Sequence, residues 1–192
     1  MISLKELIQS SRTIRRFYQD ELILETTLID LIDLARLSPS AGNIQPLKYV
    51  ISNTPSKNDL IFSCLGWAGY LKDWPGPEKG EQPSAYIIIL GDLSICRDFG
   101  CDHGIACQSI MLGAREKGLG GCIIGAIQRQ KLKSILKLSD QYDILLVLAL
   151  GKPKENVIIE EISNNQEIQY YRDSDQCHHV PKRKLEDIII VA

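Results

Sequence analysis

Three arginines and a threonine stand close together near the N-terminus, where residues 12–16 read Arg-Thr-Ile-Arg-Arg. A guanidinium can donate two parallel hydrogen bonds to a pair of phosphate oxygens, and a neighbouring hydroxyl adds a neutral donor. A second basic group, residues 182–184, lies near the other end of the chain. A short basic segment on its own is more often a solvated loop, but two such segments favour a shared anion site.

The segment from Ser38 to Pro46 gathers small and amide-bearing residues between two prolines. Ser40 and Asn43 can both donate and accept hydrogen bonds, and the small residues between them leave room for a flat ring to approach the backbone. A plain turn accounts for this composition equally well, because proline and asparagine are common turn residues. The segment is therefore either a connecting loop or one wall of a ligand site.

Four glycines lie among the eight residues from Gly118 to Gly125. They do not match the dinucleotide fingerprint G-x-G-x-x-G, whose third glycine would fall at Ile123, and no phosphate-binding loop of the Gly-Lys-Ser/Thr type follows. A helix C-cap and a tight entry into a strand explain the glycines from 118 to 121. They do not explain Gly125, where a ligand could approach backbone amides closely.

The cysteines and histidines form a weaker candidate. The chain has six cysteines, and Cys96, Cys101 and Cys107 lack the Cys-x-x-Cys spacing that marks zinc and cluster sites. Residues 177–179, Cys-His-His, stand alone in the sequence. We therefore expect buried or surface thiols rather than a metal site, and no Ser-His-Asp or Cys-His arrangement indicates a catalytic nucleophile.

Alternating helical and strand-like segments must position these groups. A capping box at residues 3–6 predicts a short first helix, and apolar residues at helical spacing predict helices over 28–37, 102–117 and 131–138. β-Branched apolar runs predict strands at 47–52, 86–90 and 144–150. Residues 74–83, rich in proline and glycine, predict an exposed loop or flap, and residues 160–179 show no regular pattern. The apolar run at 188–191 would be an exposed edge unless it pairs with another strand, such as one from a second copy.

Composition sets the outer limits. With 192 residues and no clear boundary, residues 1–192 form one mixed α/β domain. A net charge of −2 argues against a dedicated nucleic-acid binder, and the longest apolar runs are too short to span a membrane. The charged N-terminus does not resemble an export signal, so we expect a cytoplasmic protein with reduced cysteines.

Taken together, these segments resemble the nitroreductase family of flavin-dependent oxidoreductases. The resemblance runs from Arg12 to about Leu185 and rests on four motifs in the expected order: residues 12–17, 38–46, 118–125 and 148–153. Three features depart from the family pattern. Leu47 stands where the family often has Trp, Ile124 stands where some members have an acidic residue, and residues 65–82 match poorly. These departures leave the expected cofactor unchanged and affect the identity of the substrate.

The resemblance implies a three-layer α-β-α sandwich with a mixed sheet, assembled as a domain-swapped homodimer that binds FMN at its interface. It implies one group of residues for the FMN phosphate and ribityl chain: Arg12, Thr13 and Arg15, closed by Lys182 and Arg183. It implies a second group around the ring: Pro39, Ser40, Ala41 and Asn43 from the partner subunit, with backbone groups of Ile124 and Gly125 near the reactive edge. Residues 182–192 would extend to the partner, and loss of Arg15 would weaken FMN retention.

The implied activity is an FMN-dependent oxidoreductase that takes hydride from NAD(P)H and reduces a nitroaromatic, quinone or similar acceptor by a ping-pong mechanism. Such chemistry needs no acid-base side chain from the protein, so we assign no catalytic residue. The unusual segment at 65–82 keeps an alternative open, a flavin-binding protein without turnover that acts as a sensor, store or partner. A third hypothesis is a thiol or metal protein built on the cysteines.

Overall fold

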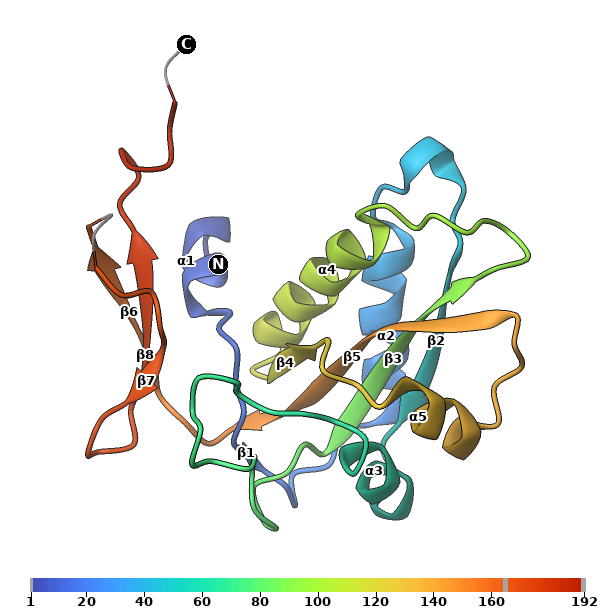
Figure 1. Cartoon of the computed structure of the whole chain (residues 1–192), viewed down its shortest axis with the longest axis horizontal. Coiled ribbons are helices and arrows are strands. Elements are labelled where there is room, and N and C mark those ends of the chain that lie inside the picture. Colours follow the sequence, from blue (N-terminus) through green and yellow to red (C-terminus); the bar gives the residue numbers. More distant parts are fainter. Residues whose placement is uncertain (1, 164–165, 191–192) are drawn as a thin grey trace.

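The computed structural model describes residues 2–163 and 166–190. Figure 1 shows its helices packed around a central sheet, with a smaller sheet standing to one side. The elements in chain order are α1 (Leu4–Ser10), β1 (Phe17–Tyr18), α2 (Glu25–Arg36), the short 3₁₀ turn η1 (Ala41–Asn43), β2 (Leu47–Ser52), α3 (Pro55–Phe62), β3 (Ala85–Asp92), α4 (Asp102–Glu116), β4 (Gly120–Ile124), α5 (Arg129–Leu136), β5 (Tyr142–Pro153), β6 (Val157–Ile162), β7 (Tyr171–Arg172) and β8 (His178–Arg183).

Five strands form the central sheet, in the order β1-β5-β3-β2, with β4 also paired to β5. All these strand pairs are antiparallel. A parallel contact occurs as a single bridge between Thr13 and Gly121. The central sheet was expected to be mixed, and its parallel pairing is limited to this one bridge. The bridge joins the arginine-rich segment to the start of β4.

Alternating side chains of β3 face two separate layers of helices. Ala85, Ile87 and Ile89 pack into a core with residues of α2 and α4. Their neighbours Tyr86 and Ile88 pack into a second core with residues of α3 and α5. Because every residue of β3 is buried, both faces of the strand are apolar, which is why its sequence is a continuous apolar run. The predicted three-layer α-β-α sandwich is confirmed.

Local sequence signals fix the two helices that lead to the site. The predicted capping box begins α1, with the Glu6 amide donating to the Ser3 hydroxyl and the Ser3 amide donating to the Glu6 carboxylate. The second of these helices, α4, is capped at its C-terminal end. Gly118 has a φ of 74° there, and its backbone amide and that of Leu119 donate to carbonyls of the last helical turn. This cap turns the chain directly into β4.

Residues 74–83 form no helix or strand, as predicted, and the expected exposure holds for only part of this loop: Pro75, Glu78, Lys79 and Gly80 are exposed. Gly76, Pro77 and Glu81 are buried. The carboxylate of Glu81 pairs with Arg16 and with Lys154, which pin this segment to the body of the protein. A glycine is required at position 76, because φ is 122° there and a Cβ would lie 2.7 Å from the Trp67 ring.

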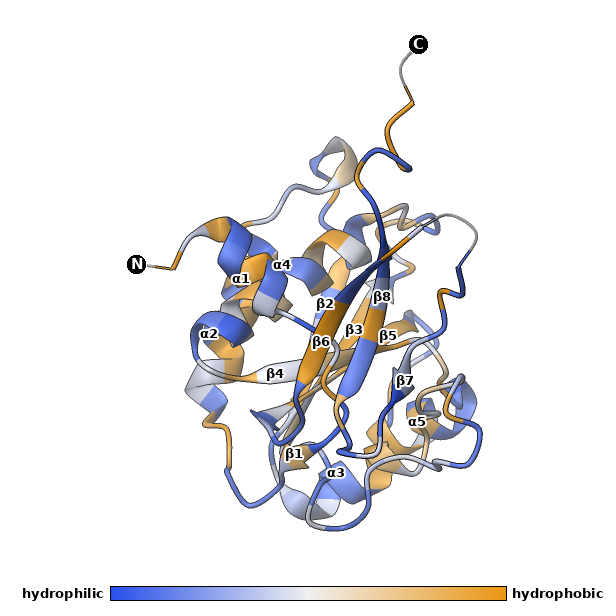
Figure 2. Ribbon diagram, turned by 90° about the vertical axis from the view of Figure 1, so that its left-hand side faces the viewer, coloured by the Kyte–Doolittle hydropathy of each residue, from blue (hydrophilic) through white to orange (hydrophobic). Residues whose placement is uncertain are grey.

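The second sheet lies beside α1 and comes entirely from the C-terminal part of the chain. β8 pairs in parallel with β6 and antiparallel with β7. Figure 2 shows β6 and β8 together on the side of the molecule that also carries α1. This sheet was not predicted, since residues 160–179 appeared irregular in sequence. It places Lys182, at the end of β8, close to the N-terminal arginine segment.

The chain beyond β8 differs from the simple terminal strand expected from its sequence. Lys182 and Arg183, the first residues of the predicted 182–192 extension, belong to β8 and pair with β6 in the same chain. The described residues that follow form no strand, and Ile188, Ile189 and Ile190 are exposed on a segment that projects from the body (Figure 1). Residues 191–192 lie outside the described part of the chain.

Candidate functional site

A cavity of about 200 Å³ lies where the end of α1, the middle of α4, β4 and β8 meet. It unites residues from the two ends of the sequence, because Arg12 and Thr13 line one part and Lys182 lines another. Its full lining is Ser11, Arg12, Thr13, Gln108, Met111, Ile123, Val180 and Lys182. Two cations, two hydroxyls and an amide therefore surround one small space, a donor set that suits a phosphate group.

Arg12 has hydrogen-bonding capacity to spare in this cavity. One of its terminal nitrogens, Nη2, donates to the carbonyl of Ile8 at 2.7 Å. Its Nε is buried and has no partner among the described residues. Burial also lowers the pKa of Arg12, because the charged form loses contact with water. An anion in the cavity would supply the acceptor that the buried Nε lacks.

Arg15 lies elsewhere, although it comes from the same short motif. Its side chain is buried, with Nη1 3.1 Å from Nε2 of His178 and the guanidinium 4.6 Å from the centre of the Tyr170 ring. It does not line the cavity. Burial first, and then the nearby charges of Arg15 and Arg172, lower the pKa of His178 to about 4. His178 is therefore neutral near pH 7 and can accept the hydrogen bond that Arg15 donates.

A buried carboxylate, Glu155, organises the surroundings of Arg15. It accepts hydrogen bonds from the backbone amides of Arg15 and Arg16, and its other oxygen lies 2.8 Å from Nη2 of Arg172. The side chain of Arg172 in turn covers the Trp74 ring, with 4.3 Å from the guanidinium carbon to the ring centre. We call Arg15, Glu155, Tyr170, Arg172 and His178 the internal cluster. It joins the N-terminal motif to the small sheet and, through Trp74, to the loop at 74–83.

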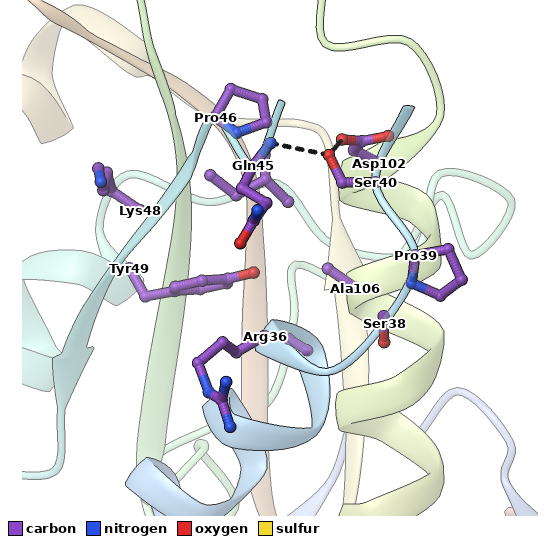
Figure 3. Close-up of a pocket in the computed structure, with 12 residues that line it drawn as sticks. Arg36, Ser38, Pro39, Ser40, Gln45, Pro46, Lys48, Tyr49, Asp102 and Ala106 are labelled. Atoms are coloured by element: carbon purple, nitrogen blue, oxygen red, sulfur yellow. Dashed lines mark hydrogen bonds between the residues drawn. The ribbon is translucent and has the colours of Figure 1, made fainter. Parts of the chain in front are cut away.

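The turn at 38–46 is shaped by another buried carboxylate. Asp102, in the first turn of α4, accepts a hydrogen bond from the Ser40 hydroxyl at 2.6 Å and one from the Ala41 amide at 3.0 Å. The same Ser40 oxygen accepts a hydrogen bond from the backbone amide of Gln45 at 2.9 Å (Figure 3). The position of Asp102 at a helix N-terminus favours its negative charge. Asn43 lies exposed at a φ of 55°, directly after Gly42 with the same φ.

A second pocket, of about 210 Å³, opens against this turn. Pro39 and Ser40 line it, and Figure 3 shows the Tyr49 phenol and the side-chain amide of Gln45 directed into the same space. Burial is the main cause that raises the pKa of Tyr49 to about 12. The phenol therefore stays protonated near pH 7 and remains a hydrogen-bond donor.

The two pockets use different faces of α4 and have no lining residue in common. Asp102 and Ala106 face the turn at 38–46, whereas Gln108 and Met111 face the cavity around Arg12. Of the residues predicted to hold the phosphate, Arg12, Thr13 and Lys182 line the cavity. Of those predicted to line the ring, Pro39 and Ser40 line the second pocket, whereas Ala41 and Asn43 do not. Within one chain these two groups are therefore separate. This separation is the arrangement that an interface site shared between two protomers would require.

The end of β4 provides the third part of the predicted site. Ile124 is buried in the core on the α3 and α5 side, while its neighbour Ile123 is 42 % exposed and lines the cavity. Gly125 is exposed, and a Cβ there would meet only Leu146, at 3.9 Å. The backbone at this point is open to a ligand. Arg183, in contrast to Lys182, does not line the cavity.

Several residues of the site were not identified from the sequence. Gln108, Met111 and Val180 line the cavity, and Asp102 and Glu155 support the two motifs. Asp102 has the clearest sequence signal, because an acidic residue at the start of a helix is common and its partner Ser40 lies in a motif already singled out. Glu155 follows a strand and could be identified only from its contacts.

The sequence pattern of the nitroreductase family matches residues 8–67 and 97–152, more than half of the chain. The chain belongs to the nitroreductase family. The matched ranges contain α2, α4, β4 and β5 except its last residue Pro153, together with the arginine motif and the turn at 38–46. The nitroreductase assignment made from the four motifs is thereby confirmed.

Individual nitroreductase relatives are distant in sequence but extensive in coverage. The chain is 25% identical over 186 residues to 5,6-dimethylbenzimidazole synthase of Rhodospirillum rubrum, covering 83% of this chain and 86% of that protein. It is 24% identical over 208 residues to 4-nitrobenzoate reductase of Pseudomonas putida, covering 84% and 90%. The solved structure of an FMN-dependent nitroreductase from Clostridium difficile R20291 superposes with a TM-score of 0.64 at 20% identity, covering 88% of this chain and 92% of that chain.

These findings establish a nitroreductase fold and a nitroreductase-family oxidoreductase. They also show that relatives at similar distance carry different activities in their names, so the family alone does not define the substrate. Among the described residues, no helix combines the length and apolar composition needed to cross a membrane.

Proposed function

We propose that this protein is an FMN-dependent oxidoreductase that takes hydride from NAD(P)H and reduces a nitroaromatic, quinone or similar acceptor by a ping-pong mechanism. FMN, when bound, supplies the redox chemistry by accepting two electrons from the nicotinamide and passing them to the second substrate. The tasks of the protein are to hold the phosphate, orient the ring and leave one face accessible. The name of the Pseudomonas putida relative, 4-nitrobenzoate reductase, supports a nitro group as one acceptor.

The observation that carries this proposal is the cavity around Arg12. It joins Arg12, Thr13 and Lys182 from opposite ends of the chain, and the buried Nε of Arg12 is left without a partner among the described residues. A dianionic phosphate would satisfy that donor and balance the two cations. The donor set therefore fits FMN, with Arg12, Thr13 and Lys182 as phosphate ligands and Gln108 as an additional donor.

We further propose a homodimer in which the turn at 38–46 of one protomer lies against the ring held by the other. The turn and the cavity are separate within one chain, so a second copy is needed to bring them together. Exposed apolar side chains near the turn and at the C-terminal end, including Leu37, Ile44 and Ile190, provide surface for such an interface. The partner would then receive Pro39, Ser40, Ala41 and Asn43 beside its flavin.

Each supporting residue has a defined task in this arrangement. Asp102 fixes Ser40 and the Ala41 amide, so the wall of the ring site is set before the ligand arrives. Glu155 fixes the backbone at Arg15 and Arg16, immediately after the cavity residues. Ile124 anchors β4 in the core, so that the open backbone at Gly125 is held in place.

The test is to replace Arg12 by Gln and measure FMN affinity from the quenching of flavin fluorescence. Loss of a charge-assisted phosphate contact should weaken binding about 10- to 100-fold, corresponding to roughly 1.5–3 kcal/mol. Arg97→Gln is the matched control, because it removes the same charge from an exposed position outside both pockets. Equal affinity in Arg12→Gln and the parent would overturn the assignment of the cavity.

Turnover is tested separately by adding NADH or NADPH to the FMN-loaded protein without oxygen. Bleaching of the yellow colour, followed by recovery when a nitroaromatic or quinone is added, is the result expected of the oxidoreductase. A yellow protein that does not bleach would instead indicate the alternative, a flavin-binding protein that acts as a sensor, store or partner.

A further inference from the structure

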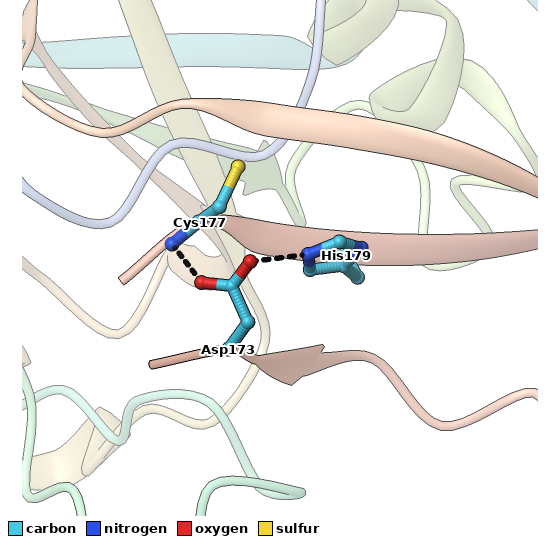
Figure 4. A group of neighbouring side chains, drawn as sticks. All are labelled: Asp173, Cys177 and His179. Carbon is cyan, nitrogen blue, oxygen red and sulfur yellow. Dashed lines mark hydrogen bonds and ion pairs between the residues drawn. The ribbon is translucent and has the colours of Figure 1, made fainter. Parts of the chain in front are cut away.

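Three potential metal ligands meet at the hairpin between β7 and β8, in a part of the small sheet that lines neither pocket. Asp173, Cys177 and His179 each offer one ligand atom, and these atoms all lie within 4.8 Å of one another. They provide one oxygen, one sulfur and one nitrogen. Figure 4 shows the Asp173 carboxylate directed at His179, whereas the Cys177 sulfur points away from this pair, with its thiol 3.7 Å from the carbonyl of Asn156. Spacing along the chain does not indicate this site, because an aspartate upstream of a single Cys-His-His run matches no standard zinc motif.

The hairpin itself holds Asp173 in a fixed orientation. One oxygen, Oδ1, accepts hydrogen bonds from the backbone amides of Asp175 at 3.0 Å and Cys177 at 2.8 Å. Gln176 has a φ of 62°, which turns the chain back into β8. The second oxygen, Oδ2, is thereby directed toward His179, 2.9 Å from its Nε2.

The imidazole of His179 is oriented by residues outside the three ligands. Its Nδ1 lies 2.6 Å from Oε1 of Glu160 on β6, and its ring is stacked on that of Tyr171 with 4.7 Å between the ring centres. The Tyr171 hydroxyl also donates to Glu160, at 3.2 Å. Metal-binding histidines commonly donate one ring N–H to a carboxylate, which leaves the other nitrogen free to ligate. Glu160 is placed for this role at Nδ1. Nε2, which hydrogen-bonds to Asp173 when no metal is bound, is the nitrogen that a metal would take in place of that proton.

We propose that Asp173, Cys177 and His179 form a Zn²⁺ site, with Oδ2, Sγ and Nε2 as ligands and water in the fourth position. Tetrahedral zinc bonds would place the oxygen and nitrogen about 3.3 Å apart, so these two atoms need to separate by roughly 0.4 Å. The sulfur reaches the same ion by rotation of the half-exposed Cys177 side chain. A thiolate among the ligands favours Zn²⁺ over Mg²⁺ or Ca²⁺, which prefer oxygen. Binding releases two protons to solvent, one from the Cys177 thiol and one from the Nε2–H of His179 that donates to Asp173 when no metal is bound.

The position of the site gives the ion a structural task. It would tie the end of β7 to the start of β8, the strand that continues from His179 to Val180 and Lys182 at the cavity. The site itself depends on neither FMN nor a second protomer. Its test is therefore independent of the proposed function.

The experiment uses the full chain without an added histidine tag, freed of metal by a chelator under reducing conditions and then titrated with Co²⁺. We expect one Co²⁺ per chain, with a charge-transfer absorption band from the Cys177 thiolate that disappears when Zn²⁺ displaces the cobalt. Cys177→Ser should abolish the band. Cys96→Ser is the matched control, because Cys96 has similar partial exposure but lies far from Asp173 in sequence and outside the cluster, so the band should persist.

Two further variants separate direct ligands from the residue that orients them. His179→Gln should abolish stoichiometric binding, whereas Glu160→Gln should retain the band with a dissociation constant about 10- to 100-fold higher. Thermal melts of each variant in chelator confirm that the fold is retained. Absence of saturable Co²⁺ or Zn²⁺ binding in the parent, or an unchanged band in Cys177→Ser, would overturn the proposal.

Discussion

The cavity around Arg12 and the internal cluster around Arg15 show two opposite uses of the same arginine-rich motif. In the cavity, two cations converge and no carboxylate lines the space, so their charge is available to a ligand. In the internal cluster, Glu155 supplies the negative charge and His178 accepts from Arg15. A cation that faces no carboxylate of the protein is available to bind an anionic ligand, whereas a cation within a network of charged side chains serves to hold the fold together. Two arginines only three residues apart therefore have different surroundings, and we propose different roles for them, phosphate binding for Arg12 and a structural role for Arg15.

Three buried carboxylates extend this comparison, because their partners differ in charge and exposure. Glu155 faces a buried arginine, Asp102 faces neutral donors, and Glu81 faces cations that are partly in water. The cost of removing each carboxylate should fall in that order, since an unpaired charge costs most where water cannot reach it.

The largest effect is expected for Glu155→Gln. The side chains of Glu155 and Arg172 are 1% and 9% exposed, so the substitution leaves a buried guanidinium facing an amide N–H₂ in place of a carboxylate. Breaking a buried pair of this kind typically costs about 3–5 kcal/mol of unfolding free energy, measurable by urea denaturation. Asp140→Asn removes an exposed carboxylate paired with Lys133 and should cost less than about 1 kcal/mol. Similar losses in the two variants would contradict a structural role for the internal cluster.

An intermediate effect is expected for Asp102→Ala. The substitution leaves the Ser40 hydroxyl and the Ala41 amide without their acceptor, which should cost about 1–3 kcal/mol of unfolding free energy. Asp102→Asn keeps one acceptor oxygen and should lose less. If the turn serves the partner's flavin, Asp102→Ala should also weaken FMN binding to the dimer. A variant as stable as the parent would show that the turn is held by other contacts.

How far the sequence could predict this molecule depends on whether the signal was local. The helix at 102–117 and the strands at 86–90 and 144–150 follow from periodicity within each segment, and the structure confirms them with small shifts in their ends. The small sheet was missed because β6 (Val-Ile-Ile-Glu-Glu-Ile) and β8 (His-His-Val-Pro-Lys-Arg) lack the alternation of apolar and polar residues that marks a half-buried strand. The two strands are stabilised instead by pairing with each other across a long connection. The burial of Gly76, Pro77 and Glu81 within the loop at 74–83 was missed because it depends on contacts with Arg16 and Lys154, which come from distant parts of the chain.

The site shows the same limit. Residue types indicated an anion site, and the convergence of Arg12 with Lys182 was expected from the family resemblance. No property of residues 12–16 could tell which arginine lines the cavity, because Arg15 is held by Glu155 and His178, which lie 140 and 163 residues away. Asp173 was missed in a similar way, since its relation to His179 depends on the hairpin between them.

The smallest effect is expected for Glu81→Gln, and it should depend on pH. The pKa of Glu81 lies below its ordinary value of 4.5, first because Arg16 donates to its carboxylate and then because Lys154 does so, against the opposing effect of burial. A depressed pKa means that this pairing stabilises the fold fully above pH 4.5 and ceases to do so as the pH falls through the lowered value. The two cations are 23% and 39% exposed, so the stabilisation should be only about 1 kcal/mol.

The pH dependence of that loss distinguishes charge from packing. The glutamine side chain of the variant is neutral at every pH, so in the acidic range only the parent loses the charge at position 81. The difference in unfolding free energy between parent and variant, measured by urea denaturation, should therefore be constant from about pH 7 to pH 5 and shrink below it. A difference that persists unchanged down to about pH 3 would show that Glu81 acts through packing rather than through its charge.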